Sequence, residues 1–265
     1  MYISLTGMTE PLGESQVLEY LEGLSASHDI YLYSFERQKD KSLLLSLKQR
    51  LARSNIRWKY QFYSNKYGVF SAFSIHLFAF FRLFLWAMFI KPDIFHCRSF
   101  FPAVLGFSLA KIMRKKILFD IRGFAMEEKI DSGRLSRESL LFRVLDKVEH
   151  CLYRQSDYVV VLTLKAKEIL CKDFQVSSQN ISVIPTCASR KRFFPADIVE
   201  KSRLRGKYNV DLSEKVLIHV GCTGRWYDLD SEIKLFSGCI IRIHEPFCYS
   251  DQGRRKIHSS PFSTV

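Results

Sequence analysis

The sequence has no closely paired cysteines of the kind that bind metals or carry out redox chemistry. Its cysteines are scattered, without a C-x-x-C pair, and no secretory signal precedes the first predicted strand. We therefore expect reduced thiols in a cytoplasmic protein. We expect no bound metal and no other cofactor.

Acidic residues are scarce, with 27 Asp and Glu against 40 Lys and Arg, which gives a formal net charge of +13. Such a charge attracts an anionic partner, either a membrane, a nucleotide or a nucleic acid. The sequence has no RNP-like aromatic sequence, no zinc finger and no sustained basic helix interleaved with aromatic residues. We therefore do not expect nucleic acid to be the partner, and an anionic membrane surface stays open.

One long hydrophobic run, Val69 to Ile90, has the length of a membrane-spanning helix. It contains His76 and Arg82, and an arginine at the centre of a bilayer costs about 2.5 to 3.5 kcal/mol on insertion scales. The run also falls where the chain needs a helix between two strands. We predict a buried or membrane-leaning helix, with a true span as the alternative.

Short β-rich runs alternate with longer segments of helical spacing between Met1 and Ile184, which predicts an α/β fold. The strand runs are too continuously apolar to have a wet face, so we expect a Rossmann-like, doubly wound parallel sheet with helices on both sides. Ligands of such sheets gather at the carboxyl ends of the strands. After the amino-terminal run, the predicted strands are Asp29–Phe35, Arg57–Phe62, Asp93–Cys97, Lys116–Ile121, Asp157–Leu162 and Ile181–Ile184.

An apolar strand that leads into a glycine-bearing loop and a helix occurs twice, at Met1–Gly13 and at Lys215–Tyr227. The second copy predicts the first strand and helix of a second Rossmann-like domain. We therefore expect four parts of the chain: an amino-terminal domain at 1–184, an interdomain linker and helix at 185–214, the start of a truncated domain at 215–238, and an irregular tail at 239–265.

Five segments in order resemble the pattern of glycosyltransferase family 4. They are TGMTEPLGESQVLEYLEGLS at Thr6–Ser25, FDIRGFAMEE at Phe119–Glu128, SDYVVVLTLKAKEIL at Ser156–Leu170, VIPTCASRKRFFP at Val183–Pro195 and VLIHVGCTGRWYDLD at Val216–Asp230. The resemblance implies the GT-B architecture, in which two Rossmann-like domains face a cleft. It also implies that the amino-terminal domain holds a glycan or lipid-linked acceptor and the carboxy-terminal domain a nucleotide-sugar donor.

The first of these segments contains a candidate binding loop. Amide groups at the start of a helix attract phosphate, so Gly13, Ser15 and Gln16 are candidates to approach a donor diphosphate. The alternative is purely structural, with Pro11 and Gly13 forming a turn and Ser15 capping the helix.

The second segment supplies the candidate catalytic residues, Asp120 and Arg122, at the carboxyl end of a strand. Similar enzymes often have histidine where this chain has Arg122. An arginine suits an anionic phosphate or acceptor better than proton abstraction because its guanidinium stays protonated in proteins. Asp120 is therefore the candidate base, although a structural contact between Asp120 and Arg122 is equally compatible with the sequence. Gly123 and Glu127 follow as candidate substrate contacts.

Two further groups complete the predicted site. His96 and Arg98 end the preceding strand and are candidates to line the same cleft, although a strand histidine is more often a packing residue. Gly221, Gly224 and Arg225 resemble the donor-phosphate loop of the second domain, with a plain strand-ending turn as the alternative.

The chain also departs from the family pattern. Family members carry two glutamates eight residues apart in the donor domain, and here only Glu232 and Glu245 follow Val216. Two hypotheses result. The chain is a glycosyltransferase, impaired by truncation, that uses a lipid-linked or polysaccharide acceptor and lies in the cytoplasm or at the inner membrane face. Alternatively, it is a non-catalytic remnant or a module that binds acceptor or membrane.

Overall fold

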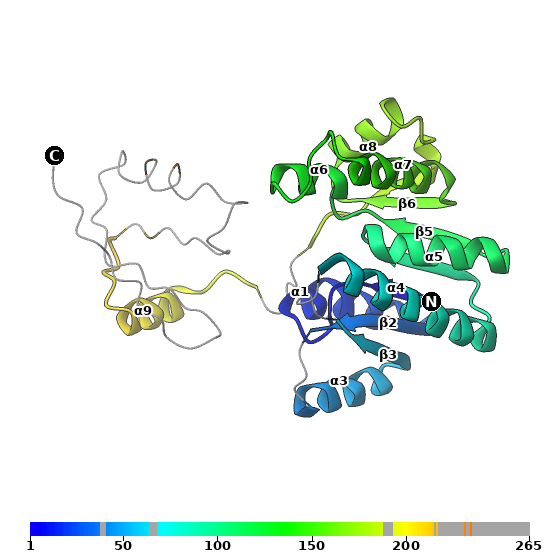
Figure 1. Cartoon of the computed structure of the whole chain (residues 1–265). Helices are drawn as coiled ribbons and strands as arrows, with labels where there is room; N and C mark the ends of the chain where they lie inside the picture. The colour runs from blue at the N-terminus through cyan, green and yellow to red at the C-terminus, as the bar shows by residue number, and fades with distance from the viewer. Residues whose placement is uncertain are drawn as a thin grey trace. The chain divides into compact units, whose positions relative to one another are not determined.

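The computed structural model describes residues 1–37, 41–63, 68–187, 193–214, 216, 231 and 234, with the side chains of 68–73 left aside. The chain divides into two compact units, Met1–Phe194 and Pro195–Val265. The first contains the sheet (Figure 1). In the second, helix α9 (Ile198–Lys207) begins where the amide of Glu200 donates to the Asp197 carboxylate at 2.8 Å.

The first unit is built on a parallel sheet of seven strands in the order β3-β2-β1-β4-β5-β6-β7. This confirms the predicted Rossmann-like, doubly wound sheet, and each predicted strand is present with small differences at its ends. The strands are β1 (Tyr2–Ser4), β2 (Ile30–Glu36), β3 (Ile56–Phe62), β4 (Ile94–Arg98), β5 (Lys116–Asp120), β6 (Tyr158–Val161) and β7 (Ile181–Val183).

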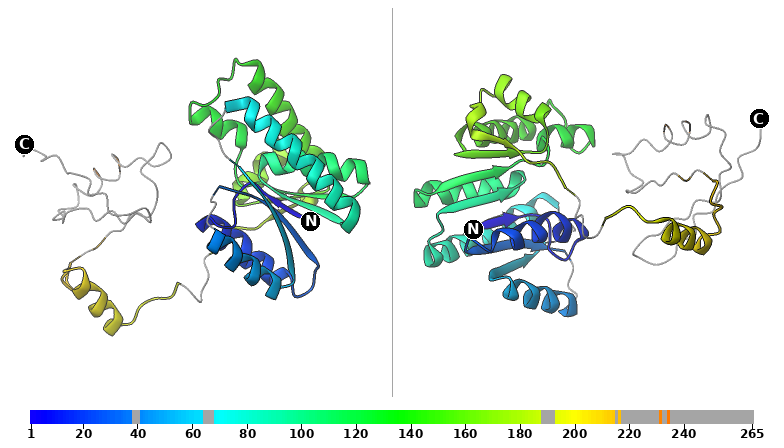
Figure 2. Two further views of the ribbon diagram at one scale, coloured as in Figure 1. Left: turned by 60° about the horizontal axis from the view of Figure 1, so that its bottom comes forward. Right: turned by 180° about the vertical axis from the view of Figure 1, so that it is seen from behind.

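Helices cover the two faces of the sheet in two groups (Figure 2). Parallel crossovers are right-handed, so connections that run in opposite directions from β1 place their helices on opposite faces. One apolar cluster joins α2 (Glu19–Leu24) and α3 (Lys41–Arg53) to β1–β3. The larger cluster joins the other face to α4 (Gly68–Ile90), α5 (Phe100–Met113), α7 (Leu140–Gln155) and α8 (Leu164–Lys172).

Helix α6 (Ala125–Asp131) follows β5, where the sequence predicts candidate site residues but no helix. It is short, and its first residue lacks a local side-chain cap. Instead, the buried Glu149 carboxylate of α7 accepts from the amides of Ala125 at 2.9 Å and Met126 at 3.4 Å. A cap supplied from so far along the sequence leaves no local signal, which explains why periodicity missed this helix.

The long hydrophobic run forms α4, the crossover helix between β3 and β4. Ala79, Leu83 and Ala87 are fully buried against the sheet, whereas Leu85 and Phe89 are 69% and 88% exposed. Among the residues that the structure describes, no helix combines the length and apolarity needed to cross a membrane. The run is therefore a crossover helix with one buried and one exposed face.

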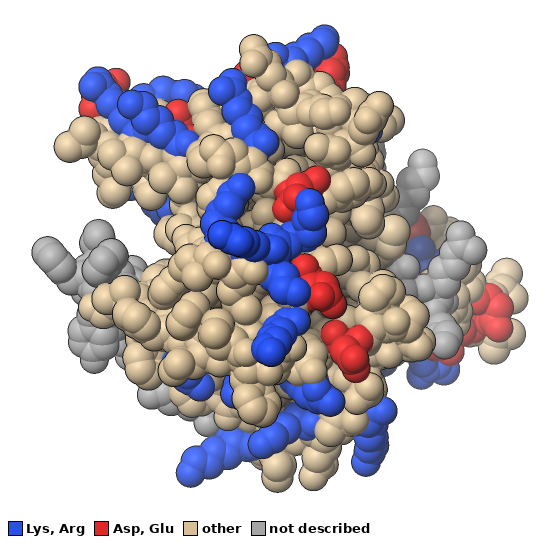
Figure 3. Space-filling model, turned by 90° about the vertical axis from the view of Figure 1, so that its right-hand side faces the viewer, with Lys and Arg blue, Asp and Glu red and all other residues tan. Residues whose placement is uncertain are grey.

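Basic side chains are spread over the surface rather than confined to one element. On the side of the molecule seen in Figure 3, Lys and Arg form a band with a few carboxylates between them. Two lysines among the described residues pair with aspartates: Nζ of Lys115 lies 3.3 Å from Oδ1 of Asp93, and Nζ of Lys116 lies 2.6 Å from Oδ1 of Asp157.

The predicted start of a second Rossmann-like domain at 215–238 and the predicted tail at 239–265 lie almost wholly outside the described residues. The division into four parts stays a prediction.

Candidate active site

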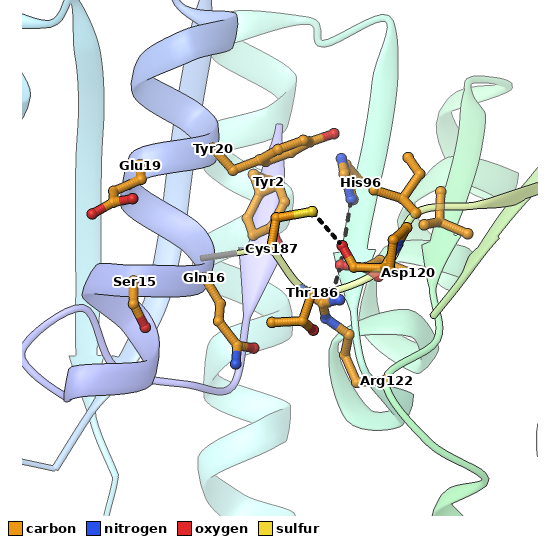
Figure 4. A pocket seen from close by; sticks show the side chains of 13 residues that line it. Tyr2, Ser15, Gln16, Glu19, Tyr20, His96, Asp120, Arg122, Thr186 and Cys187 are labelled. Atoms are coloured by element: carbon orange, nitrogen blue, oxygen red, sulfur yellow. Dashed lines mark hydrogen bonds and ion pairs between the residues drawn. The ribbon is translucent and has the colours of Figure 1, made fainter. Parts of the chain in front are cut away.

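A pocket of about 330 Å³ opens at the carboxyl ends of the central strands (Figure 4). The position follows from topology, because β1 lies between β2 and β4 and the crossovers from this point go to opposite faces. Its lining comes from β1, the π-helical turn η1 (Glu14–Leu18), α2, β4, β5, the loop after β5, β6 and the segment after β7. The lining residues are Tyr2, Ser15, Gln16, Glu19, Tyr20, His96, Asp120, Arg122, Val160, Ile184, Pro185, Thr186 and Cys187.

The loop after β1 already binds an anion from its own chain. The buried Glu36 carboxylate, at the end of β2, accepts from the amides of Met8 at 2.8 Å and Thr9 at 3.1 Å. It also accepts from the hydroxyls of Thr9 and Ser34 at 2.7 and 2.5 Å. Because a carboxylate fills this cradle, these amides are not free for a diphosphate.

Gly13 does not line the pocket. It ends the short helix α1 (Pro11–Gly13), and a Cβ built on it would lie 1.9 Å from the carbonyl oxygen of Gly7. The close approach that this glycine permits is therefore to the protein's own backbone.

Ser15 and Gln16 do line the pocket, from a π-helical turn of a kind often found at functional sites. The Ser15 hydroxyl donates to the carbonyl of Pro11 at 2.8 Å. Of the structural alternative, the cap by Ser15 is wrong because the helix begins at Pro11, whereas Pro11–Gly13 does form a helical turn. The Gln16 side-chain oxygen accepts from the Arg98 guanidinium at 2.6 Å.

Three basic side chains surround one carboxylate oxygen at the floor of the pocket. Oδ2 of Asp120 lies 3.5 Å from Nε of Arg122, 3.6 Å from Nη1 of Arg98 and 3.9 Å from Nε2 of His96. These three nitrogens and Oδ1 of Asp120 are buried without a hydrogen-bond partner in the described part of the chain. Buried polar atoms are normally paired, so this cluster is suited to a polar ligand.

The environment sets the charges of the cluster. Burial lowers the pKa of His96 below its usual value, and the nearby Asp120 opposes this only in part, so the imidazole is neutral at pH 7. Burial also lowers the pKa of Arg122, which still stays protonated because arginine starts so high. Two guanidinium groups against one carboxylate leave the floor with an excess positive charge, which favours an anionic ligand.

His96 should make the protein less stable in mild acid. Because its pKa is lower in the folded than in the unfolded chain, the unfolded chain binds more protons below about pH 6.5, and stability falls as the pH falls. Burial raises the pKa of Glu149, which acts in the opposite direction at lower pH. We therefore expect His96→Gln to show a smaller loss of stability than the wild type between about pH 6.5 and 5. Urea unfolding of both proteins at several pH values measures the difference, and identical slopes would contradict it.

Arg122 lies in the loop between β5 and α6. This loop is held where the amide of Ile121 donates to the carbonyl of Val160 at 2.8 Å, and where Glu149 caps α6. Gly123 and Glu127 do not line the pocket. The Glu128 carboxylate packs against Gly123, and Glu127 forms an ion pair with Arg137.

Several lining residues were not predicted. Tyr2 stacks obliquely on His96 with ring centroids 4.4 Å apart, and Tyr20 meets the same imidazole edge-on at 6.2 Å. Thr186 and Cys187 line the pocket because they follow the carboxyl end of β7. The rule that predicted Asp120 therefore applies to them as well. No comparable signal predicted Tyr2, which lies at the start of β1.

The predicted donor-phosphate residues Gly221, Gly224 and Arg225 lie outside the described residues. In the part of the chain that the structure describes, no group of three or more His, Cys, Asp or Glu is placed to hold a metal ion. A site without metal stays a prediction.

Comparison with known families now identifies the class of protein. The sequence model of Glycosyltransferase Family 4 matches residues 13–192, which is more than half of the chain. The chain therefore belongs to glycosyltransferase family 4, as the five segments predicted. The comparison with curated proteins found no match.

Solved structures share the fold. HepE of Anabaena, in complex with UDP and glucose, matches with a TM-score of 0.59 and 13% identity over 90% of this chain and 58% of its own. Sucrose-phosphate synthase of Thermosynechococcus elongatus matches with a TM-score of 0.65 and 12% identity over 91% of this chain and 60% of its own. At these identities the likeness concerns the fold, which is that of GT-B glycosyltransferases. The chain spans less than two thirds of the length of either structure.

Proposed function

We propose that this chain is the acceptor side of a glycosyltransferase that transfers a sugar from a nucleotide-sugar to a lipid-linked or polysaccharide acceptor. The observation that carries the proposal is a cluster of buried polar atoms on Asp120, Arg122, His96 and Arg98, at the switch point of a family 4 fold. Among the described residues, these atoms have no hydrogen-bond partner. A nucleotide-sugar donor is supported by HepE, whose structures contain UDP and UDP-glucose. A place at the inner face of a membrane belongs to the same proposal.

The residues divide the chemistry between them. An acceptor hydroxyl attacks the anomeric carbon, the bond from that carbon to the diphosphate breaks, and the hydroxyl proton passes to a base. Asp120 is our candidate for the base, with Oδ1 left unpaired beside the cation cluster. Arg122 pairs with a phosphate or with another anionic group of the substrate, held in place by its contact with Asp120. Tyr2 and Tyr20 supply flat apolar surface beside the polar floor.

A second candidate is a module that binds the acceptor without turnover. The observation that favours it is that every residue of the pocket lies in the unit Met1–Phe194. Acceptor binding therefore needs no residue of the second unit. This candidate predicts weak donor binding, with a millimolar or weaker dissociation constant for nucleotide-sugars, because the described pocket belongs to the proposed acceptor side.

A transfer assay separates the two candidates. The chain is incubated with a panel of radiolabelled nucleotide-sugars and with either bacterial lipid extract or polysaccharide as acceptor. Labelled product supports glycosyl transfer, whereas acceptor binding without product supports the module. Calorimetry with the same donors checks the expected weak affinity, and micromolar binding would show that the chain carries a donor site after all.

A further inference from the structure

The exposed face of α4 carries a continuous apolar ridge. Its members recur at helical spacing and are at least half exposed: Phe78, Phe81, Leu85, Met88 and Phe89, with 58%, 55%, 69%, 51% and 88% of their surface accessible. Residues three and four apart lie on one side of a helix, so these side chains form a single stripe. Exposed apolar patches of this kind mark interaction sites in soluble proteins.

A cationic groove adjoins the ridge. It has a volume of about 590 Å³ between α4 and the strands β2 and β3, and it is lined by Tyr31, Tyr33, Arg57, Lys59, Arg82, Leu85, Trp86, Phe89 and Ile90. Leu85 and Phe89 belong to both the groove and the ridge, so the two features form one surface. No carboxylate of the described residues lines the groove.

The three cations of the groove contact aromatic rings rather than carboxylates. The Arg57 guanidinium lies 5.0 Å from the Tyr31 ring centroid, and Lys59 Nζ lies 4.7 Å from that of Trp86. Arg82 lies 6.0 Å from Tyr33 and forms no ion pair among the residues that the structure describes. Lys115 and Lys116, by contrast, are partnered by aspartates. The positive charge of the groove is therefore available to an anionic partner.

We infer that this surface, the α4 ridge with its cationic groove, docks the protein onto an anionic lipid bilayer. The apolar ridge enters the boundary between headgroups and acyl chains, and Arg57, Lys59 and Arg82 contact lipid phosphates. Charge complementarity favours a bilayer over an uncharged protein partner. Since no described helix is suited to crossing a membrane, α4 lies on the bilayer and does not span it. This surface accounts for the place at a membrane that the proposed function includes. Only the biological purpose of the docking, and not the docking itself, rests on the proposed function.

Vesicle flotation tests this inference without any transfer activity. The full chain is mixed with vesicles of phosphatidylcholine alone or of equal parts phosphatidylcholine and phosphatidylglycerol. We expect binding to the anionic vesicles at low salt and release as salt rises to about 1 M, where the Debye length is about 3 Å. Equal binding to both vesicles, or no binding to either, would overturn the inference.

Two variants locate the surface. The first variant removes all three cations of the groove, by Arg57→Gln, Lys59→Gln and Arg82→Gln. It should weaken binding to anionic vesicles by about 100-fold, because each cation near the membrane strengthens binding roughly fivefold. Leu85→Ser with Phe89→Ser should weaken it at least tenfold. Thermal unfolding establishes that each variant is folded.

Matched controls remove the same chemistry elsewhere. The first control removes an equal charge from other exposed positions, by Lys41→Gln, Arg143→Gln and Lys147→Gln. Leu140→Ser with Leu164→Ser removes two leucines that are 76% and 77% exposed. Both controls should bind vesicles like the wild type. If they lose binding equally, or if sedimentation shows that the ridge variant only dissociates a dimer, a bilayer is not the partner of this surface.

Discussion

Replacing Gly13 by alanine should destabilise the protein by about 3 kcal/mol, because overpacking against backbone cannot relax as a side chain can. The new Cβ would lie 1.9 Å from the Gly7 carbonyl oxygen and 2.9 Å from the Met8 Cα. Either the α1 turn or the loop after β1 must then move. The α1 turn leads directly into η1, which carries Ser15 and Gln16, and the loop carries the Glu36 contacts, so the pocket should be disturbed as well. Urea unfolding measures the change in free energy.

Gly23 provides the matched control for this prediction. It lies in the neighbouring helix α2, and nothing comes within 4 Å of a Cβ built on it. Alanine there should stabilise the protein by about 0.5 to 1 kcal/mol through helix propensity. If Gly13→Ala lowered the free energy of unfolding no more than Gly23→Ala does, α1 would not pack against the loop as described.

Replacing Arg122 by glutamine should reduce glycosyl transfer by about 100-fold, a loss typical of removing one charged group that stabilises a transition state. The side chain is 21% exposed and borders the pocket, and its only ion pair in the described part of the chain is with Asp120. We therefore expect the free energy of unfolding to change by no more than about 1 kcal/mol. The transfer assay and urea unfolding on one preparation separate the two effects.

Arg143→Gln on the exposed face of α7 is the control, and it should leave transfer unchanged. A variant at Arg122 that keeps its activity, or that loses activity only because it unfolds, would show that Arg122 has a structural role.

Most of the fold could be predicted because its signals are local. Strands such as β2 and β5 are short apolar runs, and α7 and α8 begin at Ser139 and Thr163, whose side chains cap them. The positions of Asp120, His96 and Arg98 followed from the rule that such sheets bind ligands at the carboxyl ends of their strands.

What sequence reasoning missed depends on partners far apart in the chain. The Glu36 carboxylate accepts from an amide of the loop after β1, at Met8, which lies 28 residues away in the sequence. No local pattern reveals this contact, so the loop was expected to be free to bind phosphate. The sequence also predicted that Gly13 faces a ligand. Its close approach to the Gly7 carbonyl can be recognised only when the positions of α1 and the π-helical turn are known. Tyr2 joins the pocket only because β1 is flanked by β4, a pairing that no local pattern encodes.

The most direct test of the account asks whether ligands occupy this pocket. Cys187 lines it and is exposed, whereas Cys151 and Cys171 lie elsewhere at intermediate exposure. Alkylation by iodoacetamide is followed at each cysteine by mass spectrometry, with UDP-glucose, glucose 1-phosphate or a membrane lipid extract added separately. We predict that at least one of these slows alkylation of Cys187 and leaves Cys151 and Cys171 unchanged. If none of them protects Cys187, or if all three cysteines respond alike, the pocket is not the substrate site.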